Sequence, residues 1–157
     1  MSARFPIPFG GETMNPQQNT QVARRWFEEV WNERRRESVH ELAHPESVGH
    51  MEHADVRKRE DFLDFQAMFL NAFPDLRVVV EDTAAEGENV VVRWFFSATH
   101  RGDALGCRAT GKTVQMRGMT WLKLRDGKVV ESWYCWNLGA LMQYLTNEAS
   151  SDGSCCR

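Results

Sequence analysis

The chain has 157 residues, of which 42% are hydrophobic and 26% charged, with a formal net charge of -3. A chain of this length fits one domain and can bury a sizeable core without a metal or disulfide staple. The charge balance lacks the basic excess of nucleic-acid-binding proteins, and no apolar run reaches membrane-spanning length. We therefore expect one globular domain that binds neither nucleic acid nor membrane and needs no cofactor.

The cysteines favour a reduced protein over a disulfide framework. Cys107 and Cys135 lie in otherwise apolar segments, whereas Cys155 and Cys156 are adjacent in a tail rich in serine and glycine. Prolines and glycines interrupt the apolar residues of segment 1–14, which therefore lacks the apolar core of a secretory signal. These features predict a cytoplasmic protein.

The first regular element is a helix that begins at Asn15. Asn15 suits the cap position, Pro16 the first helical position, and Gln18 can reach back to the cap. Val22 and Trp26 then begin an apolar stripe at helical spacing, with charged residues on the opposite face. This pattern predicts an amphipathic helix that covers a core.

Two further helical segments follow, Glu37–Ala43 and Asp61–Phe73, each stopped by a proline. Between them, the histidine-rich stretch His44–His53 shows no clear period. We predict that this stretch is an irregular loop.

The remainder of the chain reads mainly as strands, joined at one point by the hairpin signal Asp126-Gly127. The predicted strands are Arg77–Val80, Asn89–His100, Thr113–Leu124 and Lys128–Asn137, and a closing helix follows at Leu138–Leu145. Helices followed by antiparallel strands are typical of an α+β domain with its helices on one face of the sheet. We place the domain at 15–146, between a flexible arm at 1–14 and a disordered tail at 147–157.

Both faces of the last predicted strand are rich in apolar and aromatic residues. Strict alternation places on one face Val129, Glu131, Trp133, Cys135 and Asn137, and on the other Val130, Ser132, Tyr134 and Trp136. Helices can cover one face, and a second copy of the sheet covers the other most economically. We therefore predict a homodimer formed through the outer face of the sheet.

From Gln21 to Leu145 the chain resembles the SnoaL-like polyketide cyclases of the nuclear transport factor two-like superfamily. The landmarks, in order, are Trp26–Asn32, Ala72–Leu76, Val91–Trp94, Thr99–Gly102, Thr110–Lys112, Asp126–Trp133 and Leu138–Leu141. The resemblance implies a cone-shaped α+β barrel, in which the N-terminal helices pack on a strongly curved antiparallel or mixed sheet that encloses a pocket.

The same resemblance implies a reaction, the closure of a polyketide ring by intramolecular aldol addition. The family's acid/base residue is an aspartate at the end of the last strand, and the matching position here is Asn137. An amide donates and accepts hydrogen bonds but does not exchange a proton near neutral pH. Asn137 is therefore expected to orient a substrate oxygen rather than to move a proton.

Histidines supply the alternative proton carriers. His40 and His44 have the spacing of a helical metal pair, but the third ligand is ambiguous and Pro45 breaks the geometry, so we expect no metal site. His50 falls where family members place a pocket-lining residue. His100 stands at a strand end, and its alternative is a solvated loop position.

Arg93 is a charge in an apolar strand, which is costly unless the charge is paired or faces a polar cavity. Either Arg93 enters the pocket and holds a carboxylate or carbonyl, or it pairs with Glu131 on a neighbouring strand. The residue types suited to lining a pocket for a flat ring are Trp31, Phe65, Phe69, Met116, Trp121, Trp133 and Cys135.

These patterns predict a protein that binds a small hydrophobic, carbonyl-bearing ring compound. It would act as a cyclase or isomerase if His50 or His100 moves protons while Asn137 and Arg93 orient oxygens. The alternative is a non-catalytic binding or structural dimer. Epoxide hydrolysis would need two carboxylates flanking a water. Phe95 occupies a position where such a site would require an acidic residue, so the sequence does not favour this activity.

Overall fold

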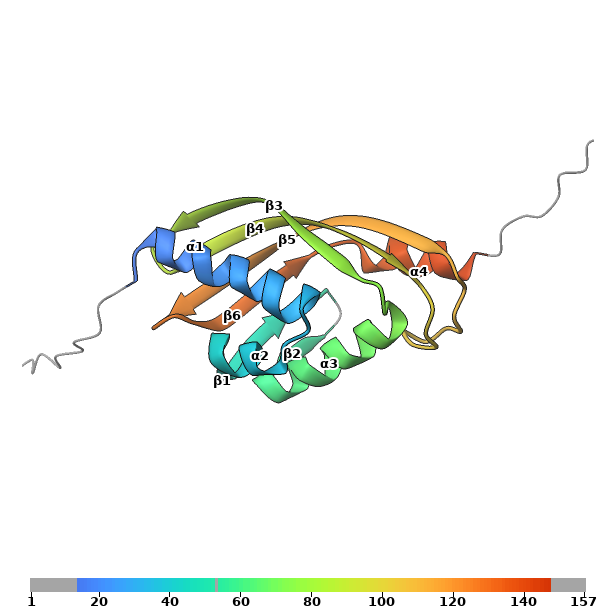
Figure 1. The fold of residues 1–157 in the computed structure, drawn as a ribbon, viewed down its shortest axis with the longest axis horizontal. Helices are drawn as coiled ribbons and strands as arrows, with labels where there is room; N and C mark the ends of the chain where they lie inside the picture. The colour runs from blue at the N-terminus through green and yellow to red at the C-terminus, as the bar shows by residue number, and fades with distance from the viewer. Residues whose placement is uncertain (1–13, 53, 148–157) are drawn as a thin grey trace, which may run out of the picture.

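A computed structural model describes residues 14–52 and 54–147, where the chain forms four α-helices, one π-helical segment and six strands (Figure 1). The elements are α1 (Pro16–Arg25), η1 (Trp26–Asn32), α2 (Arg36–Leu42), β1 (Ala43–His50), β2 (Asp55–Arg57), α3 (Arg59–Ala72), β3 (Arg77–Glu86), β4 (Asn89–Thr99), β5 (Thr113–Arg125), β6 (Lys128–Cys135) and α4 (Leu138–Thr146). Residues 1–13 of the predicted arm and nearly all of the predicted tail, with Cys155 and Cys156, lie outside the described residues.

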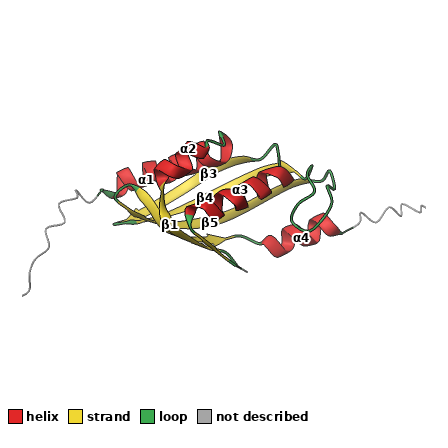
Figure 2. Ribbon diagram, turned by 90° about the horizontal axis from the view of Figure 1, so that it is seen from below, coloured by secondary structure: helices red, strands yellow, loops and turns green. Residues whose placement is uncertain are grey.

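The strands form one mixed sheet in the order β2-β1-β6-β5-β4-β3. β1 runs parallel to β6, and all other neighbours in the sheet are antiparallel. The sheet is strongly curved and open, with α1, α2 and α3 on its concave side and α4 beyond one end (Figures 1 and 2). This is the α+β architecture, with helices on a curved mixed sheet, that the sequence predicted.

The start of α1 is capped as predicted. The Gln18 amide donates to Asn15 Oδ1 at 2.9 Å, and the Asn15 amide donates to Gln18 Oε1 at 2.8 Å. Pro16 occupies the first helical position, where no backbone donor is needed. The helix continues into η1, which carries Trp26, Phe27, Val30 and Trp31 into the core.

Two side-chain amides hold η1 in place over the sheet. Gln66 Nε2, on α3, donates to the Val30 carbonyl at 2.5 Å. Asn32 forms a two-way link with β3, donating from Nδ2 to the Val78 carbonyl and accepting from the Val78 amide. These bonds fix the position of Trp31, which lies between the two anchors.

The predicted loop over His44–His53 is wrong for most of its length, because residues 43–50 form strand β1. This strand pairs with β2 on one side and β6 on the other. Its register with β6 shifts between Ala43 and Val48, and Pro45, which cannot donate to a ladder, lies within that irregular part. The irregularity and the polar composition explain why no period-two pattern revealed the strand.

A bulge in β6 reverses the predicted assignment of its faces. Leu124 pairs with Val129 and Lys123 with Glu131, so Val130 is an extra residue without a partner on β5. Val129 and Ser132 are both buried on the concave side. Because one extra residue moves all later side chains to the other face, Val129 does not share a face with Glu131, Trp133 and Cys135, contrary to the prediction.

Candidate functional site

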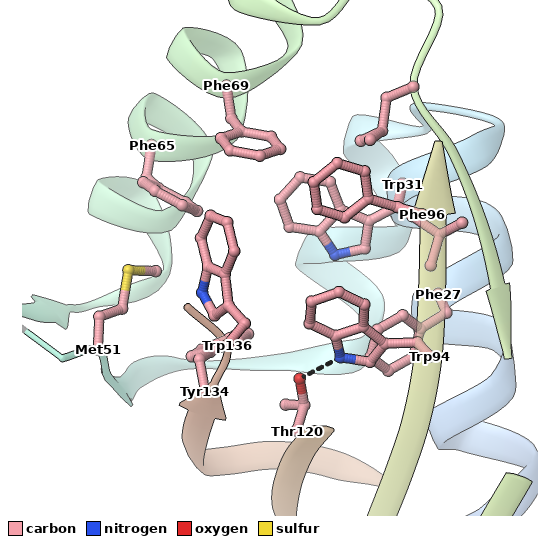
Figure 3. Close-up of a pocket in the computed structure, with 12 residues that line it drawn as sticks. Phe27, Trp31, Met51, Phe65, Phe69, Trp94, Phe96, Thr120, Tyr134 and Trp136 are labelled. Carbon is pink, nitrogen blue, oxygen red and sulfur yellow. Dashed lines mark hydrogen bonds between the residues drawn. The ribbon is translucent and has the colours of Figure 1, made fainter. Parts of the chain in front are cut away.

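An aromatic cavity of about 50 Å³ lies between the concave face of the sheet and the helices α3 and η1 (Figure 3). Hereafter it is called the aromatic cavity. Its lining residues are Phe27, Trp31, Met51, Phe65, Phe69, Leu76, Val78, Trp94, Phe96, Thr120, Tyr134 and Trp136. Met51, Phe65, Tyr134 and Trp136 are partly exposed, which indicates where the cavity reaches the surface. The lining suits a flat apolar ligand with few polar groups.

Several of the rings around the aromatic cavity pack edge to face. The Trp31 ring meets the Phe65 and Phe69 rings at centroid distances of 6.5 and 6.0 Å, and the Trp136 ring meets the Phe69 ring at 5.8 Å. Trp94 closes the opposite side, and its Nε1 donates to Thr120 Oγ1 at 2.9 Å. This bond engages the Thr120 hydroxyl and fixes the indole plane.

Tyr134 carries the only titratable side chain among the described residues that line the aromatic cavity. Burial raises the pKa of its phenol, and a hydrogen bond with Ser132 partly offsets that effect. The ring packs against Gly49, where an added Cβ would lie 3.2 Å from Tyr134 Cε2. Tyr134 is therefore a neutral phenol near pH 7, able to donate a hydrogen bond to a ligand.

The structure brings together three of the predicted lining residues: Trp31, Phe65 and Phe69 all line the aromatic cavity. The predicted positions of Trp133 and Cys135 are wrong, because the β6 bulge turns both side chains to the outer face. Tyr134 and Trp136 take the inner positions instead.

Two β5 residues show the same division between faces. Trp121 is 49% exposed on the outer face, where its ring meets that of Trp133 at 6.1 Å. Met116 is half-buried and borders a groove between β5 and α4, outside the aromatic cavity. Neither residue therefore lines the aromatic cavity, contrary to the prediction.

His50 also lies on the outer face rather than in the aromatic cavity. Its Nδ1 is 3.0 Å from Asp55 Oδ1 and its Nε2 is 2.9 Å from Glu131 Oε1, and its ring stacks on Trp133. The hydrogen bond to Glu131 is the main reason that the pKa of His50 is raised. A histidine bonded to two carboxylates favours the protonated form, which donates from both nitrogens.

His100 is fully buried but does not line the aromatic cavity. Its Nδ1 accepts a hydrogen bond from the Thr110 amide at 3.2 Å, and its ring packs against Phe73. His100 therefore ties the β4–β5 loop to the end of α3. The predicted alternative of a solvated loop histidine is also wrong, because the side chain is 0% exposed.

Arg93 and Asn137 take structural positions on the surface. Arg93 is exposed on the outer face, 3.5 Å from Glu81 on β3, so neither predicted role, in the pocket or paired with Glu131, is found. Asn137 is exposed and caps α4, accepting from the Ala140 amide at 2.8 Å. Its amide is thus directed at the helix and not into the cavity.

Sequence reasoning missed Tyr134, Trp136, Trp94 and Thr120 as lining residues. A signal was present, since Tyr134 and Trp136 belong to the second aromatic face of the last strand. Alternation grouped them correctly but could not reveal the bulge that turns this group inward. Among the described residues, no cluster of three or more His, Cys, Asp or Glu side chains is placed to hold a metal ion, and none of the described helices could cross a membrane.

A family model, that of the SnoaL-like polyketide cyclases, matches residues 21–145 of the chain. The chain belongs to the SnoaL-like polyketide cyclase family. No curated protein matches it. The order and spacing of the landmarks noted in the sequence thus gave the correct family.

Solved structures of several relatives share the fold. A proposed SnoaL-like polyketide cyclase from Jannaschia sp. CCS1 is 30% identical, with a TM-score of 0.81 over 88% of this chain and 100% of that one. AclR, a proposed hydroxylase from Streptomyces galilaeus, is 28% identical, with a TM-score of 0.74 over 83% and 97%. TsrD from Streptomyces laurentii, at 21% identity and a TM-score of 0.74 over 85% and 98%, shows the fold alone.

Proposed function

We propose that this SnoaL-like protein binds a small, flat, hydrophobic ring compound in the aromatic cavity, where the Tyr134 hydroxyl donates a hydrogen bond to a carbonyl of the ligand. The observation that carries the proposal is the position of Tyr134, a neutral phenol in a mainly apolar lining whose other hydroxyl, that of Thr120, already accepts from Trp94 Nε1. A buried carbonyl needs a donor, since an unpaired one costs about 1–3 kcal/mol. Tyr134 supplies that donor.

Ligand entry requires the aromatic cavity to expand. Its volume of about 50 Å³ is well below the roughly 300–1,000 Å³ of sites for drug-sized molecules. Trp136 is the lining residue best placed to move, because it is partly exposed and lies in the short link between β6 and α4. Its outward rotation would join the cavity to the surface.

We favour binding over ring closure because the described lining residues of the aromatic cavity include no strong base. Closure by aldol addition requires a base that removes a proton from carbon. Within the described residues, neither a carboxylate nor a histidine lines the aromatic cavity, and a neutral phenol is a weak base. Cyclase or isomerase chemistry is the second candidate. It is supported by the family and by Tyr134, which can polarise a carbonyl as a proton donor.

The two tyrosines of the chain provide a matched test. Fluorenone, a flat ring compound with one carbonyl, serves as the probe, and its binding is followed by quenching of tryptophan fluorescence. Tyr134→Phe removes one hydrogen bond and should weaken binding about three- to tenfold. Tyr144→Phe, on the exposed face of α4, should leave the affinity unchanged. Equal affinities for both variants would exclude Tyr134 as the carbonyl donor.

We further propose that the protein self-associates through the outer face of the sheet. This face carries Val79, Met119 and Trp121, each about half exposed, beside the ring of Trp133. Exposed apolar groups of this size, rimmed by charged side chains, are typical of interaction surfaces. A second copy offers the same surface and would cover it symmetrically.

A further inference from the structure

A second and smaller cavity, of about 20 Å³, lies behind Tyr134 and is called the rear cavity. Tyr134 lines both cavities and therefore forms part of the wall between them. Residues of η1, β1, β2, α3 and β6 enclose the rear cavity. Ser47 and Lys58, which are partly or fully exposed, mark its solvent side.

Trp26 contributes a buried donor without a partner to this region. The side chain is 3% exposed and its ring packs against Phe62 at 5.0 Å. Among the described residues, nothing accepts a hydrogen bond from its Nε1. Leaving such a donor unmet costs about 1–3 kcal/mol, so an acceptor at this position would stabilise the fold.

The rear cavity has the size and polarity that one water molecule requires. A water needs roughly 10–15 Å³ and two to four polar partners. Besides Trp26, the lining offers the hydroxyls of Ser132, which is 5% exposed, and of Tyr134. Gly49 preserves the space, because an added Cβ there would lie 3.3 Å from Ser132 Oγ.

We propose that the rear cavity holds one ordered water, which accepts a hydrogen bond from Trp26 Nε1 and bonds to the hydroxyls of Ser132 and Tyr134. Trp26 and Ser132 are then positioning residues for Tyr134. The water donates to the phenol oxygen from the Ser47 and Lys58 side, and the phenol O–H remains available to donate to a ligand in the aromatic cavity.

The water also sets the ionisation of the phenol. A water that donates to the phenolate stabilises the charged form and opposes the effect of burial, which raises the pKa of Tyr134. Lys58 is the only other titratable side chain among the described residues that line the rear cavity. The inference rests on the proposed function only for its consequence, the supply of a proton donor to a ligand.

The test uses a high-resolution crystal structure together with a tyrosine titration, neither of which needs a ligand. The parent should show a water within hydrogen-bond distance of Trp26 Nε1 and Ser132 Oγ, and Trp26→Phe should lose it. In a Tyr144→Phe background Tyr134 is the only tyrosine, since the chain has two. Its ionisation can then be followed by NMR of a labelled ring carbon. Trp26→Phe should move the titration upward by about one pH unit.

Trp121→Phe is the matched control, because its indole Nε1 donates to Asn89 on the outer face, away from both cavities. It should change neither the water nor the titration. A rear cavity without water in the parent, or equal titrations for Trp26→Phe and Trp121→Phe, would overturn the inference. If Trp26→Phe does not fold, Ser132→Ala takes its place, with loss of the ordered water as the expected result. A bound water without fluorenone affinity would contradict the proposed function alone.

Discussion

The two faces of β5 and β6 carry similar residues in very different states. On the concave face, Tyr134 and Trp136 line a cavity beside the buried Thr120, whose hydroxyl accepts a hydrogen bond from the indole of the buried Trp94. On the outer face, Trp121 and Trp133 are only partly covered. Tryptophan content therefore does not mark the site, whereas the direction of each side chain relative to the helices does.

The largest expected effect separates buried from exposed indoles. Trp94→Ala should lower the free energy of unfolding by about 3–5 kcal/mol, because it leaves a cavity beside Phe96 and frees the Thr120 hydroxyl. Trp121→Ala should cost about 0.5 kcal/mol. Urea denaturation measures both at a protein concentration low enough for the protein to be monomeric, so that loss of the proposed dimer contact does not add to the value for Trp121→Ala. Similar losses for the two variants would mean that the faces have been assigned wrongly.

Opening the concave face should change ligand affinity. Trp136→Ala removes the ring that packs on Phe69 and Phe96, which enlarges the aromatic cavity. Fluorenone affinity should rise about tenfold, since the ligand no longer has to displace the indole. Fluorescence titration gives the Kd, and Trp121→Ala is the control. A fall in affinity would show that the indole is part of the binding surface rather than an obstacle.

The outer face should govern self-association. Trp121→Glu places a charge in the centre of the proposed interface, beside the ring of Trp133, and should weaken dimerisation at least tenfold, by about 1.4 kcal/mol. Sedimentation velocity over a range of concentrations measures the change, with Arg36→Glu, an exposed position on α2, as a control for added charge. A parent that sediments as a monomer at every concentration would exclude the proposed dimer.

His50 offers the smallest effect, a dependence of stability on pH. Its pKa is raised in the folded state, so its contribution is fully present below the unfolded pKa of about 6.5 and is lost as pH rises through the folded value. The stability advantage of the parent over His50→Gln should therefore shrink as pH rises from 6 to 9. Partial exposure of the cluster keeps the effect small. If the stability advantage of the parent over His50→Gln instead grew with pH, the predicted direction of the pH dependence would be wrong.

The sequence predicted the family and the architecture because caps, apolar periods and landmark order are local signals. The Asn15 capping box and the Asp126-Gly127 hairpin are examples, and both are found. The β1 strand was missed because its ladder includes Pro45 and an irregular register. A strand that is largely exposed and irregularly paired, like β1, shows little alternation of apolar and polar residues in its sequence.

The site was harder to predict because it depends on one inserted residue. Val130 has no β5 partner, and this single insertion exchanges Trp133 and Cys135 for Tyr134 and Trp136 in the cavity. On α3, where helical spacing has no comparable ambiguity, Phe65 and Phe69 were placed correctly. The tertiary pairing of β5 with β6 sets the bulge, and no local pattern in the sequence reveals it.

The central claim is that the concave cavity, with Tyr134 as its donor, is the ligand site. A crystal structure of Trp136→Ala with fluorenone tests it most directly. We predict density for the ring system between Trp31 and Trp94, with the carbonyl oxygen within hydrogen-bond distance of the Tyr134 hydroxyl. Fluorenone stacked instead on Trp121 and Trp133 of the outer face, with the cavity unchanged, would contradict the claim.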